Sequence, residues 1–559
     1  MRIKKILIIA LATVLFCMTA VSAAGRKAHS AVKTEKTSVE APDTLITSGI
    51  PFNNSISAIA LAKKMECGWN LGNTLDARDN WTKTFPLNQG LGSETVWGEV
   101  TTTEKIIRTG MDNGYKTIRI PVTWCNHIID NNYTIDPVWM RRVKQVVDWA
   151  IDAGYYVILN EHHSVQDKMS KPLKHCEGYI VRKSDEKESR AFLEAVWKQI
   201  AASFNNEYDE HLIFETMNEP RNTDHVHCWA PQPDKCSECK ADLEIVSGYN
   251  QLILDTVRAS GGNNAYRFVM IPAIGTSVQN ALSDYFKLPA DSAEDKLMVT
   301  VHQYPLDSGG TGNDSHHFDT SVKSKLLQEV KALNEKFVSK GIPVVIGECG
   351  AARKGKNWAT GELIKDYVVT YQDRLDCFSF YAGLAGKYSM PFINWDCGGT
   401  DGSATIDRKT CTLYEPDYVP AVIKAWKDAE ERPETVLANL EHEDLNLDEL
   451  KVWQKDASSY DKKKRLLMLG NGWKGADIWF GIKDLSDYSM LTLTYKNASA
   501  DFVFYISYTD KTEERVNASA SSSKAVIKID RSKKAAQVCF MSHNQKVSVT
   551  IDKITFSAR

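Results

Sequence analysis

The sequence predicts a (β/α)8 barrel followed by a smaller all-β sandwich, and two patterns carry this prediction. Between residues 53 and 430, eight short apolar runs alternate with longer segments in which apolar residues recur every three or four positions. After residue 450 apolar and polar residues alternate one by one, as in antiparallel strands with one buried face. At 559 residues the chain is long enough for both domains.

The eight predicted strands are mostly continuous apolar runs, as expected for parallel strands that are covered on both faces. In chain order they span residues 67–72, 117–122, 155–163, 212–219, 267–275, 297–304, 343–348 and 391–396.

The segments between these strands carry the helical period. Val143, Val146, Val147 and Ala150 form one apolar stripe, and similar stripes cover 192–204 and 326–337, while the segment after the fifth strand gives the weakest helix signal. Gly114, Gly154 and Gly341 stand where a helix should end before the next strand. An open, doubly wound sheet would alternate in the same way, but no strand is followed by a glycine-rich phosphate-binding turn, so the barrel is favoured.

The first 23 residues have the form of a signal peptide. Arg2, Lys4 and Lys5 precede an apolar stretch at 6–20, and Val21-Ser22-Ala23 supplies a small-residue cleavage site. The apolar stretch is too short to span a bilayer comfortably, so no membrane insertion of the mature protein is expected. Residues 24–52 lack a hydrophobic period and are expected to form a flexible tether. We therefore expect an exported protein that is secreted, periplasmic or held at the cell surface.

Residues 431–450 are rich in acidic side chains and are expected to form a linker to the sandwich at 451–559. In the sandwich, rows of alternating apolar residues begin at Leu491, Phe502, Ala525 and Val547. The net charge of −3 gives no electrostatic basis for binding nucleic acid, and a monomer is expected.

Cysteine usage conflicts with export. Of the 12 cysteines, eleven remain after the signal peptide, so at least one is expected to lack a disulfide partner. Cys67, Cys377 and Cys539 fall inside apolar strand-like runs and are expected to be small buried hydrophobic residues.

Unusual polar residues gather at the carboxyl ends of the predicted strands, where barrel enzymes place their active residues. Each of them alone has an ordinary structural explanation, but six strand ends at once do not. The residues are Arg119, His162, His163, Asn218, Glu219, His302, Tyr304, Glu348, Trp395 and Asp396.

Glu219 and Glu348 end the fourth and seventh strands, which face each other across a barrel mouth. Two carboxyl groups on either side of a glycosidic bond are what its hydrolysis requires. Metal-assisted enolisation on the same fold would need further acidic residues at strand ends, and only Asp396 is available. Hydrolysis is the better prediction.

The motifs in and after the predicted strands occur in the order of a known family. The chain resembles glycoside hydrolase family 5, and its opening motif and Glu94-Thr95-Val96-Trp97-Gly98 are similar to the endoglucanase and xyloglucanase branch, subfamily 4. The motifs that carry the resemblance are Gly68-Trp69-Asn70-Leu71-Gly72-Asn73-Thr74-Leu75-Asp76, Arg119-Ile120-Pro121-Val122, Asn160-Glu161-His162-His163, Met217-Asn218-Glu219-Pro220-Arg221, His302-Gln303-Tyr304 and Val345-Ile346-Gly347-Glu348.

The resemblance implies a retaining, endo-acting β-1,4-glucan hydrolase that needs no cofactor or metal. It implies that Glu219 is the acid/base and Glu348 the nucleophile. It also implies substrate-site roles for seven residues: Arg119 and Tyr304 orient the nucleophile, Asn218 binds the sugar 2-hydroxyl, His162, His163 and His302 contact sugar, and Trp395 is the sugar platform.

The expected polysaccharide substrates are cellulose-like chains, mixed-linkage glucan or xyloglucan. Mannan or xylan is the alternative, and a non-catalytic glycan-binding protein is the contrasting class. A cationic Arg119 beside Glu348 is expected to lower the pKa of Glu348. Cys349, Cys397 and Gln303 depart from the family pattern, which leaves the shape of the subsites open.

A second cluster follows the fourth strand and includes Cys-x-x-Cys. Its residues are His225, His227, Cys228, Cys236 and Cys239. The pattern is similar to a zinc site, but in an exported protein a disulfide-pinned loop is the preferred interpretation, so no metal is expected. Together with Cys176 in the loop after the third strand, these residues could shape the wall of a cleft. Trp229 lies inside the same loop as the cluster, where it either serves a sugar subsite or packs.

Trp473, Trp479 and Tyr488 are candidate sugar-stacking residues of the C-terminal domain. They would make that domain a carbohydrate-binding module. If they are core residues instead, the domain is structural, and the sequence leaves the two alternatives open.

Overall fold

The computed structural model describes residues 49–78, 88–165, 178–306, 317–351, 371–399, 403–433, 443–485 and 488–557. The chain separates into two compact units, Met1–Phe318 with Leu326–Glu430 (the barrel unit) and Asp319–Lys325 with Glu431–Arg559 (the β-rich unit). The predicted signal peptide, nearly all of the predicted tether, and Cys176 lie outside the described residues.

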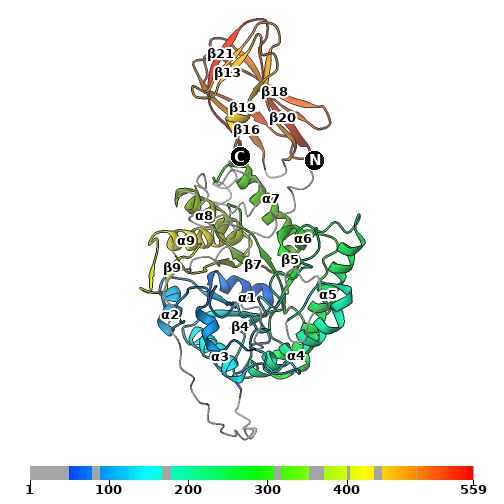
Figure 1. Ribbon diagram of the computed structural model, residues 1–559. Coiled ribbons are helices and arrows are strands. Elements are labelled where there is room, and N and C mark those ends of the chain that lie inside the picture. The colour runs from blue at the N-terminus through cyan, green and yellow to red at the C-terminus, as the bar shows by residue number, and fades with distance from the viewer. Residues whose placement is uncertain are drawn as a thin grey trace, which may run out of the picture. The chain divides into compact units, whose positions relative to one another are not determined.

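A closed barrel of eight parallel strands in the order β1 to β8 confirms the predicted fold, with helices arranged around it (Figure 1). All eight strands lie within the predicted runs or within two residues of them. They are β1 (Cys67–Asn70), β2 (Thr117–Ile120), β3 (Tyr156–Asn160), β4 (Leu212–Glu215), β5 (Val269–Ser277), β6 (Leu297–His302), β7 (Val344–Cys349) and β8 (Phe392–Asn394).

The helices follow the predicted stripes. They are α1 (Ala58–Met65), α2 (Glu104–Asp112), α3 (Pro137–Asp152), α4 (Glu186–Ser203), α5 (Ser237–Ala259), α6 (Val278–Leu282), α7 (Thr320–Lys336), α8 (Tyr371–Lys387) and α9 (Tyr418–Glu431), with 3-10 turns η1 (Leu91–Thr95), η2 (Lys183–Asp185), η3 (Gly262–Ala265), η4 (Val338–Lys340) and η5 (Leu447–Glu449).

Helix α3 shows how local sequence sets these boundaries. The Asp136 side chain accepts a hydrogen bond from Val138 N at the start, and Pro137 occupies the first turn. The helix buries Val143, Val146, Val147 and Ala150 and stops before Gly154, whose φ is +90°. Helix α6, where the signal was weakest, has only five residues.

Alternation along the strands divides the barrel interior into two layers. The lower layer is apolar and packs on Leu61 and Met65 of α1; its strand residues are Ile158, Ile213, Met270, Met298, Val345 and Ile393. Two residues further along, the same inward face carries Asn160, Glu215 and Thr300, which are fully buried. The inward-facing residues therefore form a polar layer at the carboxyl end of the barrel, next to an apolar layer.

The β-rich unit contains two antiparallel sheets. One has the order β13-β14-β21-β16-β19 with β11 beside β21, and the other β12-β15-β20-β17-β18. Their strands are β11 (Glu443–Asp444), β12 (Lys451–Val452), β13 (Ser459–Asp461), β14 (Leu466–Leu469), β15 (Gly475–Asp484), β16 (Met490–Lys496), β17 (Phe502–Tyr508), β18 (Glu513–Ala518), β19 (Lys524–Lys528), β20 (Lys534–Met541) and β21 (Val547–Ser557); β9 (Ile406–Asp407) and β10 (Thr412–Leu413) form a hairpin in the barrel unit.

Residues of both sheets share one apolar core, which confirms the sandwich. Leu491 and Leu493 of β16 meet Phe504 of β17 in it. Leu445, Leu447 and Leu450, from the segment predicted to be an acidic linker, also pack into this core.

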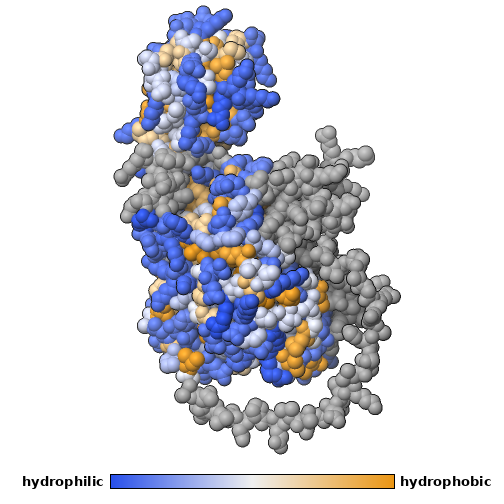
Figure 2. All heavy atoms as spheres, turned by 90° about the vertical axis from the view of Figure 1, so that its left-hand side faces the viewer, coloured by the Kyte–Doolittle hydropathy of each residue, from blue (hydrophilic) through white to orange (hydrophobic). Residues whose placement is uncertain are grey.

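Surface and cysteine features complete the description. On the face drawn in Figure 2, hydrophilic residues dominate and apolar residues form scattered patches. Among the described residues, no helix is long and apolar enough to cross a membrane. Cys67 and Cys539 are buried on strands as predicted, whereas Cys377 is buried on α8 because the apolar run around it is helical.

Candidate active site

Arg119 of β2 is the centre of the polar layer. Its side chain is fully buried, and its Nε donates to Glu215 Oε2 at 2.8 Å. Its Nη1 donates to Glu348 Oε1 at 2.7 Å, and its Nη2 donates to Asn218 Oδ1 at 2.8 Å. One guanidinium thus links the ends of β4 and β7, which a planar group with five N–H donors can do.

Glu348 near the end of β7 is held on both oxygens. Arg119 binds Oε1, and Tyr304 Oη donates to Oε2 at 2.7 Å. His302 Nδ1 lies 3.5 Å from Oε2. The carboxylate is fixed in one orientation, as a nucleophile requires.

Glu219 lies four residues beyond β4 in a strained backbone conformation, with φ of +44°. Its N donates to Thr276 Oγ1 at 3.0 Å, and its Oε1 is 3.1 Å from His302 Nδ1. Within the described part of the chain, Oε2 of this buried side chain has no hydrogen-bond partner. That oxygen lies 3.7 Å from Arg221 Nη1, beyond hydrogen-bond distance, so it can exchange a proton with a substrate.

The distance between the two carboxyl groups selects the stereochemical outcome. Glu219, His302 and Glu348 each place a ligand-type atom so that all three atoms lie within 4.8 Å of one another. Carboxyl groups about 5–5.5 Å apart suit a covalent intermediate, whereas about 6.5–9.5 Å leaves room for a water. The observed spacing fits retention of configuration.

Burial raises the pKa of Glu348, while the charges of His302 and Arg119 and the Tyr304 hydrogen bond act to lower it. Arg119 therefore has the predicted direction of effect on Glu348. The net pKa of Glu348 is nevertheless raised, because burial together with the negative charge of Glu219 outweighs the cationic neighbours.

His162, His163 and Trp395 form one wall. The His162 ring stacks on Trp395 with centroids 5.8 Å apart and 2° between planes, and His162 packs edge-on against His163. Burial lowers the pKa of both histidines well below the ordinary value, so they are neutral near pH 7 and suited to hydrogen bonding with hydroxyls. A Cβ on Gly72 would lie 2.8 Å from the Trp395 ring, which explains the glycine in the opening motif.

Of the remaining predicted residues, Asn218 can contact a ligand, whereas Asp396 supports the structure around the site. Asn218 accepts from Arg119 through Oδ1, which leaves its NH2 group for a ligand. Asp396 instead accepts from Thr405 N at 2.7 Å and Arg408 Nη2 at 2.9 Å in full burial, so it organises the loop after β8. This occupation removes the carboxylate that the enolisation alternative needed.

Two of the three departures from the family pattern make side-chain hydrogen bonds to residues other than the two carboxylates, and the third is buried. Gln303 bonds Glu329 of α7 and Tyr381 of α8, while Cys349 donates to Ile393 O and Cys397 is buried. They belong to the scaffold of the site.

Sequence reasoning missed Glu215. This fully buried carboxylate accepts from Arg119, from Asn160 Nδ2 at 2.9 Å and from Thr300 Oγ1 at 2.9 Å. The available signal was Arg119 itself, because a buried guanidinium inside a strand needs more than one acceptor. Trp97, which packs edge-on against His163 at 5.5 Å, was also given no role.

The cluster after β4 corrects another expectation. Cys236 and Cys239 are free thiols rather than members of a disulfide. Their sulfurs approach His225 and His227 instead, so histidine contacts hold this part of the loop.

Comparison with known proteins agrees with this geometry. The family described as cellulase (glycosyl hydrolase family 5) matches residues 75–401. Endoglucanase 1 of Ruminococcus albus is 37% identical over 442 residues, covering 75% of this chain and 96% of that protein. Endoglucanase B of Neocallimastix patriciarum is 36% identical over 382 residues, covering 66% of this chain and 72% of its own length.

Solved structures give the same result. A glycoside hydrolase 5 lichenase mutant from Caldicellulosiruptor sp. F32 in complex with cellotetraose has a TM-score of 0.58 at 32% identity, covering 69% of this chain and 99% of that one. A GH5-4 broad specificity endoglucanase from Ruminococcus champanellensis with bound cellotriose has a TM-score of 0.56 at 32% identity, covering 66% and 98%. With the paired carboxylates at the ends of β4 and β7, these matches show that the chain is a glycoside hydrolase of family 5, the cellulase family.

Proposed function

We propose that this enzyme is a retaining, endo-acting β-1,4-glucan hydrolase of the subfamily 4 branch, with Glu348 as nucleophile and Glu219 as acid/base. The observation that carries the proposal is the spacing of the two carboxyl groups, which have oxygens within 4.8 Å of each other while Arg119 and Tyr304 hold Glu348.

In the first step, Glu348 attacks the anomeric carbon while Glu219 transfers its proton to the departing glycosidic oxygen. The bond to the leaving sugar breaks as a bond to Glu348 forms. Arg119 and Tyr304 keep the attacking carboxylate aimed before the reaction. The free NH2 of Asn218 is positioned to bind a sugar hydroxyl beside this carbon.

In the second step, Glu219 removes a proton from water, and the oxygen of that water attacks the anomeric carbon and releases Glu348. Glycosylation neutralises Glu348, which favours the ionised form of nearby Glu219 at the moment when a base is needed. Two inversions at one carbon give overall retention.

Two measurements test this mechanism. Proton NMR of an early digest should show the β-anomer of the new reducing end first; the α-anomer first would establish inversion. The Glu219→Ala variant should regain turnover of an activated aryl glycoside when azide is added, because a small anion can attack the intermediate without base assistance. Absence of azide rescue in a folded variant would remove Glu219 from this role.

We propose cellulose-like chains, mixed-linkage glucan or xyloglucan as substrates. Support comes from relatives whose names are endoglucanase and lichenase. A panel of barley β-glucan, carboxymethylcellulose, xyloglucan, mannan and xylan tests the choice. Higher kcat/KM on mannan or xylan than on every glucan would favour the alternative substrates.

For the β-rich unit we propose glycan binding through outward indoles. Trp479 on β15 is 62% exposed and Trp473 51% exposed, and Trp453 lies over Gly475 on the outward side of the same strand. Exposed aromatic faces suit the CH faces of sugars. Tyr488, however, is buried in the core beside Phe556, so it is withdrawn as a stacking residue.

Export through residues 1–23 and a monomeric mature protein remain part of the proposal. N-terminal sequencing of the mature protein should begin close after Ala23. Light scattering after gel filtration should give the mass of one chain.

A further inference from the structure

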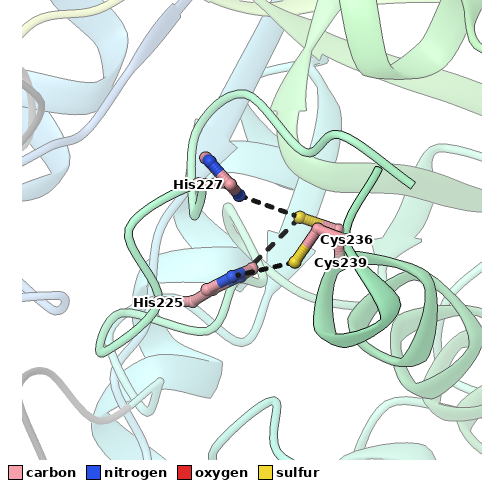
Figure 3. Close-up of side chains that lie close together, drawn as sticks. All are labelled: His225, His227, Cys236 and Cys239. Carbon is pink, nitrogen blue, oxygen red and sulfur yellow. Dashed lines mark hydrogen bonds between the residues drawn. The ribbon is translucent and has the colours of Figure 1, made fainter. Parts of the chain in front are cut away.

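We propose that His225, His227, Cys236 and Cys239 form a structural zinc site in the segment between β4 and α5. Figure 3 shows the two imidazole rings and the two thiols pointing toward a common centre. One ligand atom from each of the four residues lies within 4.8 Å of the other three.

The distances have the size of a tetrahedral zinc shell. Cys239 Sγ is 3.4 Å from His227 Nδ1, and Cys236 Sγ is 3.5 Å from His225 Nε2. With Zn–S of about 2.3 Å and Zn–N of about 2.0 Å, tetrahedral geometry separates sulfur and nitrogen by roughly 3.5 Å. Two cysteines and two histidines are a set of ligands typical of closed structural zinc sites.

Local structure brings the ligands together. Cys236 is the N-cap of α5 and Cys239 lies in its first turn, so the start of the helix places the two sulfurs close together. His225 and His227 stand on successive turns of the preceding loop, with Cys228 N donating to His225 O and Ala230 N to His227 O. The imidazoles therefore face the helix end.

A partner beyond the four ligands supports the same interpretation. Asp242, one turn further along α5 and 3% exposed, places Oδ2 3.2 Å from His225 Nδ1. An N–H bond to this carboxylate would leave Nε2 of His225 to face the metal, which is the usual arrangement of a zinc-bound histidine. Asn222 Nδ2 donates to the other oxygen of Asp242 at 3.2 Å.

A Cys236–Cys239 disulfide is the competing state. It would consume both sulfurs and leave the imidazoles without their present partners. The thiols of the structure are separate, and each contacts a histidine. Metal binding uses all four side chains.

The site lies where it can hold one wall of the active site. Arg221 donates to Glu219 O at 2.8 Å, and its guanidinium lies 4.2 Å from the Trp229 ring centroid. In the sequence, Trp229 lies between the proposed ligands His227 and Cys236. The connection from β4 to α5 is long for a loop between barrel elements. A metal cross-link would fix Arg221 and Trp229 beside Glu219; this consequence rests on the proposed function, whereas metal binding itself does not.

Metal analysis of the purified full-length protein from zinc-supplemented culture tests the site. We expect one zinc per chain by inductively coupled plasma mass spectrometry, and its removal by dipicolinate should lower Tm. Cys236→Ser and His227→Ala should each lose the zinc, while Cys411→Ser, at a free thiol outside the cluster, should keep it. Cobalt substitution of the wild-type chain should give the visible bands of tetrahedral thiolate ligation, which requires no variant to fold.

Less than one zinc in ten chains after supplementation, or a Cys236–Cys239 disulfide seen as the loss of two hydrogens in an intact peptide, would overturn the proposal. The Glu348→Ala variant separates this test from the catalytic one. It should bind one zinc and hydrolyse no glucan, so that failure of one proposal leaves the other measurable.

Discussion

The barrel and the β-rich unit fill their interiors differently. At the carboxyl end of the barrel the inward residues are Arg119, Glu215 and Glu348, joined by hydrogen bonds. The shared core of the two C-terminal sheets is aliphatic and aromatic, with Leu493 and Phe504 fully buried. In the β-rich unit the candidate ligand contacts are on the outside instead, at Trp479.

This difference indicates where each unit can act. Buried charges are costly unless they are paired, so the barrel layer is stable only as a complete network, and that network also aims a carboxylate at the barrel mouth. The apolar core of the β-rich unit needs no such network of paired charges. In that unit, ligand binding is therefore left to surface side chains.

The largest effect is expected from Glu348→Ala. Loss of the nucleophile should reduce kcat/KM on soluble β-glucan by about 10⁴-fold or more, because no other group can form the intermediate. Reducing-sugar assays measure this, with Glu335→Ala on the exposed surface of α7 as control. A variant that keeps a tenth of wild-type activity would contradict the assignment.

Glu215→Gln tests whether the buried charged residues of the barrel stabilise the fold only as a complete network. Arg119 would lose a fully buried counter-charge, and the free energy of unfolding should fall by about 3–5 kcal/mol. Urea unfolding measures this change. Glu104→Gln, which breaks the exposed pair with Arg108, should cost less than about 1 kcal/mol, and equal effects of the two substitutions would contradict the comparison.

Tyr304→Phe sharpens the account of Glu348. The Tyr304 hydrogen bond lowers the pKa of Glu348 against the larger effect of burial, so its removal should raise that pKa further. The nucleophile must be ionised, so the acid limb of kcat/KM should move to higher pH. A pH–rate profile measures the shift; an unchanged or lower acid limb with normal folding would be inconsistent with the hydrogen bond's effect.

The smallest effect is expected outside the barrel. Trp479→Ala in the Glu348→Ala background should weaken binding to insoluble glucan about three- to tenfold, the scale of one aromatic contact. Pull-down isotherms measure it, and Ile482→Ala provides an exposed apolar control on the same strand. Equal losses for both variants would argue against stacking by the indole.

Sequence patterns predicted the barrel because its strands are recognisable apolar runs that alternate with regular helices. The polar residues at the strand ends contrast clearly with these apolar runs. Glu215 escaped because it directly follows Leu212, Ile213 and Phe214 within the predicted run 212–219, and only its contact with Arg119 in the folded barrel reveals its role. The net pKa of Glu348 depends on a balance between burial and neighbouring charges that no motif encodes.

The Cys-x-x-Cys segment shows a different limit. The predicted export of the protein favoured the interpretation of a disulfide in this segment. The approach of His225 and His227 to the cysteines depends on how the loop turns back onto α5, which the sequence does not reveal. The role of Tyr488 was left open for a related reason, because its packing on Phe556 follows from the pairing of distant strands.

Trapping of the covalent intermediate tests the central claim most directly. Incubation with an activated 2-deoxy-2-fluoro-cellobioside, followed by proteolysis and mass spectrometry, should place one fluorosugar on Glu348. A label on Glu219, or turnover without any trapped sugar, would contradict the account.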